Sequence, residues 1–354
     1  MRKWCIAVGA RPNFVKAAPL IKQIDRVAES ESITYRVVHT GQHYDYNVSE
    51  VFFKDLEIPS PDTYLNVGSG SHAEQTAKVI VNFERELLAN TPDLVIVFGD
   101  TNSTLGCALA ARKLNIPIAH IEAGCRSYDM MIPEEVNRVL IDHISDYCFT
   151  PTCLDSRNLA KEGIPDSRIF FVGNILKDTI VEYQSKIQET KTWRASKAPF
   201  ALLTCHRPDN TEELWFRKIL HIVNEIGRDI NVVFPVHPRM KNFPFEQYLN
   251  ISTMPALGYL AFLKLLVSSR FVITDSGGVQ CEAAMLGVPC ITLREKTEWV
   301  DTVKAGVNFT TGLNEKYIWR LSHKFMTQTM RPCGFLLWDG NTARRIVSIL
   351  MEEG

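Results

Sequence analysis

Residues 93–124, DLVIVFGDTNSTLGCALAARKLNIPIAHIEAG, contain the pattern that decides the fold. Two apolar, β-branched runs, at 94–98 and 116–121, flank a stretch in which apolar residues recur at helical spacing. Strands that are apolar almost throughout are typical of a parallel sheet covered by helices on both faces. The stretch therefore predicts a strand–helix–strand unit of a doubly wound α/β domain.

The same alternation of strands and helices occurs on both sides of this stretch. In the first half it includes strands at 3–9 and 35–41 and a helix at 13–26. In the second half it comprises strands at 199–208, 230–238, 270–278 and 289–294, with helices at 210–227 and 280–287. Asn210, followed three residues later by Glu213, predicts a capping box at the start of one of these helices.

A chain of 354 residues exceeds what one hydrophobic core usually organises, so we expect two Rossmann-like domains. We place the first at 1–173, a connecting helical segment at 174–198 and the second domain at 199–335. Residues 336–354 carry one apolar stripe, which predicts a terminal helix that packs back across the domain junction.

Composition excludes several classes of protein. Thirty-nine basic and forty acidic residues leave a net charge of -1, too little to attract a polyanion, so we expect no nucleic-acid partner. Nine cysteines without a C-x-x-C pair indicate free thiols in a reducing compartment, hence a cytoplasmic location. The N-terminus lacks the features of a signal peptide, and no apolar run reaches the length of a membrane span, so we expect no membrane insertion.

Polar and glycine-rich motifs follow the predicted strands, at the strand ends where parallel sheets bind ligands. These motifs are GARP (9–12), TGQHYD (40–45), GDTNST (99–104), EAGCRS (122–127), HRPDN (206–210), HPR (237–239) and DSGGVQ (275–280). Their shared position predicts a ligand site assembled from several strand ends.

The DSGG turn has the chemistry of a pyrophosphate cradle. Ser276, Gly277 and Gly278 lead from a strand into a helix, so backbone N–H groups and the positive end of the helix dipole face outward. Glu282, one helical turn beyond Gly278, would accept hydrogen bonds from ribose hydroxyls. Alternatively, the glycines serve only the geometry of a strand-to-helix turn.

The first strand–helix turn is not a dinucleotide fingerprint. It lacks G-x-G-x-x-G, and no acidic residue ends the second strand, which argues against a nicotinamide-dependent dehydrogenase. Instead Arg11 and Lys16 lie at a helix start, where cations are unfavourable unless an anion binds. The alternative is that both are ordinary surface cations.

Carboxylates at strand ends are candidates for acid–base chemistry. Inversion at a carbon that bears an unactivated proton needs a group to remove the proton and a group to return it on the other face. Asp100, Glu122 and Glu134 are placed for this, beside Glu135. Asp100 can equally cap a helix, and acids after Pro133 are routine complements of the helix dipole.

Two histidines, His206 and His237, follow second-domain strands and are each close to an arginine. Such a pair can protonate a leaving group and neutralise its charge. His39 and His43 are spaced for metal binding only on a helix, and no H-E-x-x-H occurs, so we expect no metal.

Taken in order, GARPNFVKAAPLI, TGQHYD, GDTNSTLG, HIEAGCRS, PEEVNR, HRPDN, HPR, DSGGVQCEAA and ITLREKTEW resemble the non-hydrolysing UDP-N-acetylglucosamine 2-epimerases. The resemblance runs over about residues 3–310. It implies two Rossmann-like domains in a glycosyltransferase-B-like arrangement, with the active site in the interdomain cleft. It also implies no cofactor, a UDP-sugar substrate and a homodimer.

The reaction implied by the resemblance is anti elimination of UDP to a 2-acetamidoglucal, followed by re-addition with the opposite configuration at carbon 2. The product would enter the synthesis of cell-surface polysaccharide such as lipopolysaccharide O-antigen. The matching catalytic positions are Asp100, Glu122, Glu134, His206 and the supporting Arg138. The matching UDP positions are Arg11, Lys16, His237, Phe262, Ser276, Gly277, Gly278 and Glu282. Which carboxylate deprotonates carbon 2 is left open.

The chain departs from the family pattern at several points. Cys281 precedes Glu282 where typical members have two acids, and TEWVD (297–301) replaces T-E-R-P-E. The stretches at 66–77 and 297–303 resemble the branch that acts on UDP-2,3-diacetamido-2,3-dideoxyglucuronic acid, so the exact sugar stays open. Residues 69–72, SGSH, lack an arginine used for activation by substrate, and we expect that activation to be weak or absent.

Two other classes of protein fit parts of the pattern. A UDP-sugar glycosyltransferase of the same architecture would also bind UDP at the DSGG turn. A UDP-sugar sensor without turnover would keep the fold, although it would have no use for paired acid–base groups.

Overall fold

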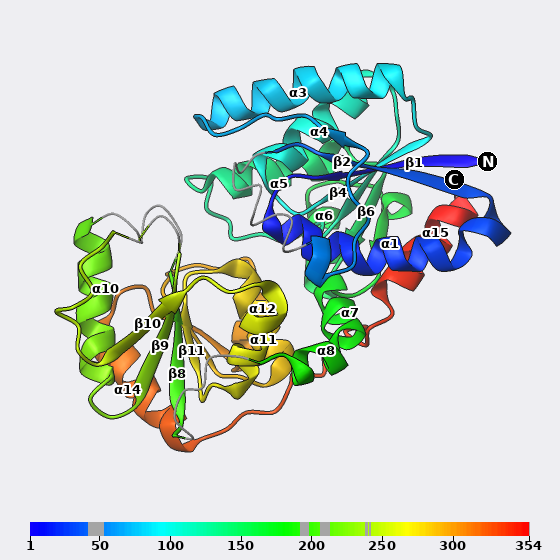
Figure 1. Ribbon diagram of the computed structural model, residues 1–354. Coiled ribbons are helices and arrows are strands. Elements are labelled where there is room, and N and C mark those ends of the chain that lie inside the picture. The colour runs from blue at the N-terminus through cyan, green and yellow to red at the C-terminus, as the bar shows by residue number, and fades with distance from the viewer. Residues whose placement is uncertain (42–52, 192–197, 206–212, 238–239, 241, 354) are drawn as a thin grey trace. The chain divides into compact units, whose positions relative to one another are not determined.

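The structure is a computed structural model that describes residues 1–41, 53–191, 198–205, 213–237, 240 and 242–353. The chain divides into two compact units, Met1–Tyr183 with Phe335–Gly354, and Gln184–Gly334 (Figure 1). Each unit contains one parallel sheet with helices on both faces, which confirms the prediction of two Rossmann-like α/β domains.

The sheet of the first unit has the strand order β3-β2-β1-β4-β5-β6-β7 among the described residues. The strands are β1 (Arg2–Val8), β2 (Ile33–His39), β3 (Thr63–Tyr64), β4 (Leu94–Phe98), β5 (Ile118–Ile121), β6 (Tyr147–Thr150) and β7 (Ile169–Phe171). The order reverses between β1 and β4, and the crevice at the carboxyl ends of such neighbours is where doubly wound sheets bind ligands.

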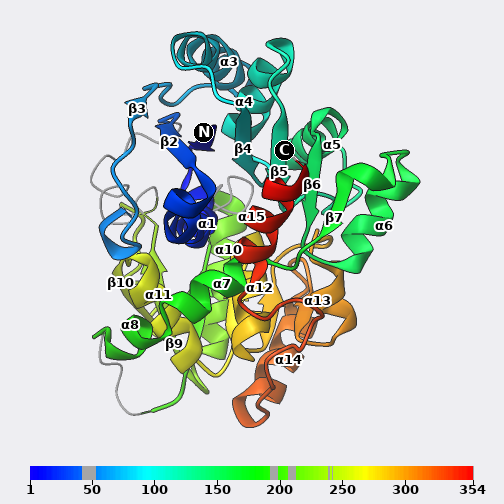
Figure 2. The same cartoon turned by 90° about the vertical axis from the view of Figure 1, so that its right-hand side faces the viewer.

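Helices α3 (His72–Ala89), α4 (Asn102–Lys113) and α5 (Pro133–Ile144) cover one face of this sheet, and α1 (Arg11–Glu31) and α7 (Ile175–Glu182) cover the other (Figures 1 and 2). Helix α6 (Cys153–Lys161) lies beside β6 and β7. Thr101 caps α4 by accepting a hydrogen bond from the Thr104 N–H. The cap starts α4 directly after Asp100, which keeps that residue at the strand end.

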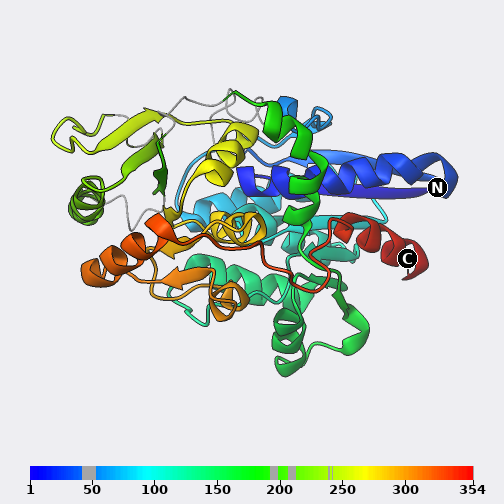
Figure 3. The same ribbon diagram turned by 90° about the horizontal axis from the view of Figure 1, so that it is seen from below.

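The C-terminal segment returns to the first unit. Helix α15 (Thr342–Glu353) packs on α1 and α7, and both chain ends lie at the same side of this unit (Figure 3). Arg2 Nη1 donates to the carbonyl oxygens of Leu350, at 3.0 Å, and Met351, at 2.8 Å. The buried Trp338 indole donates to the Pro151 carbonyl at 2.9 Å.

The sheet of the second unit has the order β10-β9-β8-β11-β12-β13. Its strands are β8 (Phe200–Thr204), β9 (Asn231–Val236), β10 (Ile251–Pro255), β11 (Val272–Thr274), β12 (Cys290–Thr292) and β13 (Asn308–Thr310). Helices α10 (Glu213–Ile226) and α14 (Glu315–Thr327) cover one face, and α11 (Tyr259–Ser268), α12 (Gly277–Leu286) and α13 (Val300–Lys304) cover the other. Helix α8 (Gln184–Glu189) contacts α11.

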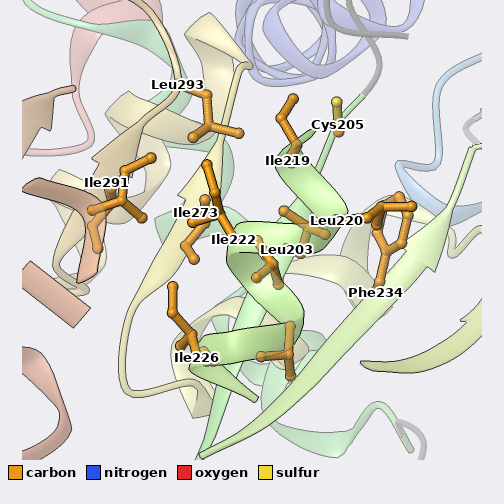
Figure 4. Close-up of a cluster of buried hydrophobic side chains, with 14 of the residues drawn as sticks. Leu203, Cys205, Ile219, Leu220, Ile222, Ile226, Phe234, Ile273, Ile291 and Leu293 are labelled. Carbon is orange, nitrogen blue, oxygen red and sulfur yellow. The ribbon is translucent and has the colours of Figure 1, made fainter. Parts of the chain in front are cut away.

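A buried apolar cluster joins α10 to the strands of this sheet (Figure 4). Leu203, Phe234 and Ile273 from the strands pack with Ile219 and Ile222 from the helix, and all are almost fully buried. Such burial contributes roughly 1.5–3 kcal/mol for each large side chain. The capping box predicted at Asn210 falls outside the described residues.

No helix in the described part of the chain combines the length and the apolar character that a membrane crossing requires.

Candidate active site

The first strand–helix turn is fastened to the neighbouring strand β4. Asn13 Oδ1 accepts hydrogen bonds from the N–H groups of Gly9 and Ala10, both at 3.0 Å. The amide of the same side chain donates to the Phe98 carbonyl at 2.9 Å. The start of α1, which carries Lys16, is therefore fixed against the strand end that leads into Asp100.

A buried ion pair joins the start of α1 to the end of β5. Lys16 Nζ lies 2.6 Å from Glu122 Oε1, and the two side chains are only 7% and 12% exposed. Glu122 Oε2 is also buried and has no hydrogen-bond partner among the described residues. Lys16 thus has an anionic partner within the protein, and one oxygen of Glu122 makes no hydrogen bond with the described residues.

Burial governs the protonation of this pair. Desolvation raises the pKa of Glu122 above its ordinary value, and the neighbouring Asp100 raises it further against the opposing charge of Lys16. Desolvation works to lower the pKa of Lys16, but the Glu122 and Asp100 carboxylates outweigh it and the pKa is raised. The ammonium therefore stays charged while the pKa of the carboxyl group moves toward the working range of a general base.

Glu122 has a left-handed backbone conformation, with φ of 76°. Such a conformation in a residue other than glycine costs about 1–3 kcal/mol and persists only where surrounding contacts enforce it. The N–H groups of Glu122 and Ala123 both donate to the Phe149 carbonyl, at 3.1 and 3.0 Å. Gly99 leaves the space for the ion pair, because a Cβ atom there would lie 3.1 Å from Lys16 Nζ.

Helix α5 holds Asp100. Arg138 Nη2 lies 2.5 Å from Asp100 Oδ2, and Asn137 Nδ2 donates to the Asp100 carbonyl at 2.8 Å. Arg138 Nη1 in turn lies 2.7 Å from Glu135 Oε2. The family resemblance assigns Arg138 to the support of the catalytic carboxylates; the structure pairs it with Asp100, and its role in catalysis stays a prediction.

The adjacent acids Glu134 and Glu135 have different environments. Glu135 is 1% exposed and accepts hydrogen bonds from the N–H groups of Ser127, at 3.0 Å, and Tyr128, at 2.7 Å. Glu135 therefore orders this loop and Arg138. Glu134 lies half-buried in the first turn of α5, and its catalytic role stays a prediction.

In the second unit the predicted cradle has the expected local form. Ser276 is the N-cap of α12, and its side chain accepts a hydrogen bond from the Val279 N–H at 3.4 Å. A Cβ atom at Gly278 would meet nothing within 4 Å, whereas one at Gly277 would lie 2.4 Å from Glu298 Oε1. Gly278 thus faces open space at the helix start, whereas a side chain at Gly277 would displace the Glu298 carboxylate.

Gln280 and the Arg294–Glu298 pair brace this turn, and sequence reasoning assigned none of the three. Gln280 Nε2 donates to the Ser276 carbonyl at 3.1 Å, and its Oε1 accepts from Thr297 Oγ1 at 2.6 Å. Arg294 Nη2 lies 2.9 Å from Glu298 Oε2, and both side chains are buried. The sequence marked this bracing network at one residue, because Gln280 ends the DSGGVQ motif.

The remaining predicted nucleotide residues lie on separate elements. Glu282 is buried on α12 beside Tyr259 of α11, where burial and then the Glu282 carboxylate raise the pKa of that tyrosine. Phe262 is half-buried on α11, and His237 is half-buried directly after β9. Arg11 begins α1 and is partly exposed. Their binding roles stay predictions.

Two of the predicted histidines, His206 and His43, lie outside the described residues. His39 stacks on Phe14 with ring centroids 5.2 Å apart, and burial lowers the pKa of His39 to about 4. Within the described residues, no group of three His, Cys, Asp or Glu side chains is arranged to hold a metal ion.

The site residues thus form two groups. One group contains Asp100, Glu122 and Arg138, which are predicted to act in catalysis, together with Lys16 and Glu135; we call it the catalytic cluster after those predictions, and it belongs to the first unit. The cradle, defined as Ser276, Gly277, Gly278 and the bracing Gln280, belongs to the second unit. The first group offers proton transfer at a buried carboxylate, and the second offers backbone N–H groups to an anion.

Comparison with known proteins identifies the family. A family model described as UDP-N-acetylglucosamine 2-epimerase matches residues 25–351. A relative from Methanococcus maripaludis, named a UDP-N-acetylglucosamine 2-epimerase homolog, is 42% identical over 97% of this chain and 98% of its own length. The UDP-2,3-diacetamido-2,3-dideoxy-D-glucuronate 2-epimerase of Pseudomonas aeruginosa is 39% identical over 98% of both chains.

A solved structure agrees with these relatives. The crystal structure of Methanocaldococcus jannaschii UDP-GlcNAc 2-epimerase in complex with UDP-GlcNAc and UDP has a TM-score of 0.89 and 37% identity, and the match covers 99% of each chain. The similarity therefore extends over both α/β units. The chain belongs to the UDP-N-acetylglucosamine 2-epimerase family.

Proposed function

We propose that this protein inverts carbon 2 of UDP-N-acetylglucosamine by anti elimination of UDP and re-addition to the resulting 2-acetamidoglucal. Family membership supports the reaction type. The single structural observation that carries the proposal is the buried Glu122, which pairs with Lys16 through one oxygen, while the other oxygen has no hydrogen-bond partner among the described residues. A binding protein would have no need of a strained, buried carboxylate with an unused acceptor.

Glu122 is the group that we assign to proton transfer at carbon 2. Burial raises the pKa of Glu122, and the charge of Lys16 at 2.6 Å opposes that rise. The ionised carboxylate can therefore still form and act as a base. Loss of the carbon 2 proton and departure of UDP from carbon 1 form the carbon 1–carbon 2 double bond. Protonation of carbon 2 from the opposite face, together with attack of the UDP phosphate oxygen on carbon 1, then removes the double bond and completes the inversion. Asp100, Glu134 and His206 are the candidates for the second acid–base group.

The cradle of the second unit is assigned to the diphosphate of UDP. Departure of UDP places negative charge on its phosphate oxygens, and backbone N–H groups at the start of α12 suit that charge. Arg11 and His237 would add positive or hydrogen-bonding groups, Phe262 would pack against uracil, and Glu282 would accept from ribose. The proposed reaction uses no cofactor.

The diacetamidoglucuronate substrate is the second candidate. A relative that carries that name is as similar, at 39% identity, as a UDP-N-acetylglucosamine 2-epimerase of Methanocaldococcus jannaschii. In addition, His72 and Gln75, from the stretch that resembles that branch, both hydrogen-bond to Asn102, at 3.0 Å. Asn102 follows Asp100 closely, so this stretch is positioned to influence which sugar fits.

We further propose a cytoplasmic homodimer whose product serves the synthesis of cell-surface polysaccharide. These parts of the proposal derive from the family resemblance and from the thiol content. The nine cysteines form no disulfide with one another in the described part of the chain, and most are buried.

Incubation of the purified protein with UDP-N-acetylglucosamine, and separately with UDP-diacetamidoglucuronic acid, tests the proposed reaction by proton NMR. We expect the carbon 2 epimer of UDP-N-acetylglucosamine to accumulate to a constant ratio while total nucleotide sugar is conserved. Stoichiometric accumulation of free sugar and UDP would instead show hydrolysis. Faster conversion of the diacetamido substrate would select the second candidate.

Replacing Glu122 by glutamine should lower kcat by about 100- to 10,000-fold, because the variant keeps the shape but cannot exchange a proton. Glu86→Gln is the matched control, since Glu86 pairs with Arg36 at 3.3 Å and has no part in the catalytic cluster. Steady-state kinetics on both variants provide the measurement. A Glu122→Gln variant with the turnover of the control would remove Glu122 from the chemistry.

The pH dependence of kcat should follow the ionisation of Glu122 in its pair with Lys16. A base must be deprotonated, so the rate falls as pH drops through the raised pKa of Glu122. Removing the opposite charge with Lys16→Met raises that pKa further and should shift the acidic limb to higher pH at saturating substrate. Lys22→Met, which removes a half-buried cation of the same helix that pairs with Glu57, should leave the limb in place. An unshifted limb in Lys16→Met would contradict the assignment.

A further inference from the structure

A second polar network lies buried beside the catalytic cluster and shares none of its residues. It consists of His120 on β5, Asp142 on α5, and Arg126 in the loop that follows β5. The exposed fractions are 0% for His120, 0% for Asp142 and 1% for Arg126. Burying three such side chains is costly unless each polar atom has a partner, so their bonds indicate what the network holds in place.

The bonds of this network end on backbone atoms of two catalytic turns. His120 Nε2 lies 2.8 Å from the carbonyl oxygen of Gly99, the residue before Asp100. His120 Nδ1 lies 2.7 Å from Asp142 Oδ1, and Asp142 Oδ2 accepts from the Gly124 N–H at 3.1 Å. One imidazole and one carboxylate thus connect the Asp100 turn to the Glu122 turn.

Arg126 completes the charge balance of the network. Its Nη1 lies 2.7 Å from Asp142 Oδ2, and its Nη2 lies 2.7 Å from Glu162 Oε2. Burial works to raise the pKa of Asp142, but His120 and Arg126 outweigh it and the pKa is lowered. Asp142 is therefore a carboxylate, and its oxygens accept from the His120 ring, the Arg126 guanidinium and the Gly124 N–H.

Helix α5 carries the residues that set both turns. Arg138 and Asp142 are four residues apart, so they lie on one side of the helix. Arg138 binds the Asp100 side chain, and Asp142 binds the turn after Glu122. Gly99 and Gly124 have positive φ values of 64° and 81°, which residues other than glycine rarely adopt. Local backbone preference therefore does little to hold the two turns in place relative to each other.

We propose that His120 and Asp142 are positioning residues for the reaction. The pair sets the distance between the Asp100 and Glu122 turns and enforces the left-handed backbone of Glu122, without contact to the substrate. The role rests on the proposed function, because it acts through Glu122. Misplacement of a reacting group by about 1 Å can cost roughly 100-fold in rate.

The test compares Asp142→Asn, His120→Phe and His120→Gln with the wild-type chain. We expect Asp142→Asn and His120→Phe to lower kcat by about 10- to 100-fold at a temperature well below thermal unfolding. The affinity for UDP, measured by calorimetry, should stay within about 3-fold, because the cradle is untouched. His120→Gln, whose amide can still donate to the Gly99 carbonyl, should retain more kcat than His120→Phe.

Asp146→Asn is the matched control. Asp146 Oδ2 accepts from the Ile118 N–H at 2.8 Å, at the opposite end of β5, and pairs with Arg112 at 2.7 Å. The control should therefore lose stability for a similar reason, because it too removes a carboxylate that accepts a backbone N–H bond. Its kcat should stay at the wild-type value. If His120→Phe does not fold, Asp142→Asn and His120→Gln carry the comparison.

The inference is overturned if the folded variants keep the kcat of the wild type, or lose no more kcat than Asp146→Asn. A wild-type chain that does not epimerise any UDP-acetamido sugar is a different result, because it contradicts the proposed function itself. The two failures are distinguished by the wild-type assay run in parallel.

Discussion

The buried ion pair between Lys16 and Glu122 is the interaction on which the rest of the catalytic cluster depends. A carboxylate taken out of water is unstable unless a charge or hydrogen bonds compensate for it. Lys16 supplies the charge to one oxygen at 2.6 Å, and the other oxygen accepts no hydrogen bond from the part of the chain that the structure describes. The protein therefore holds a desolvated carboxylate with an unused acceptor, which is the state that a general base requires.

Several surrounding contacts fix the elements that carry that pair. Asn13 fixes the start of α1 to the end of β4, and Gly99 provides room that a side chain would fill. Helix α5 holds the neighbouring strand ends through Arg138 and Asp142. Because parallel strands end at one edge of the sheet, residues far apart in the chain meet there without long loops.

Sequence patterns predicted much of this arrangement. Apolar β-branched runs marked the strands, and the motifs after them marked the edge at which charged residues gather. The DSGG motif was enough to predict that Ser276 begins a helix, because the capping of α12 is set by local residues. The two-domain α/β fold follows from the same alternation.

Other features depend on tertiary contacts that no local pattern encodes. Lys16 and Glu122 are distant in sequence, and their pairing arises only when β1, β4 and β5 are aligned. Glu134 and Glu135 look alike in a first helical turn, yet only Glu135 turns inward to Arg138 and the Ser127 loop. The positive φ of Glu122 is likewise imposed by its surroundings, since glutamate has no local preference for it.

The central claim is that one acid–base group removes the proton from carbon 2 and a second group delivers a proton to the opposite face, with Glu122 of the first unit as one of the two. Turnover of UDP-N-acetylglucosamine in deuterated water, followed by mass spectrometry and NMR of the product, tests it most directly. The account predicts solvent deuterium at carbon 2 in every molecule of epimer formed. Epimer that retains its original proton at that carbon would contradict it.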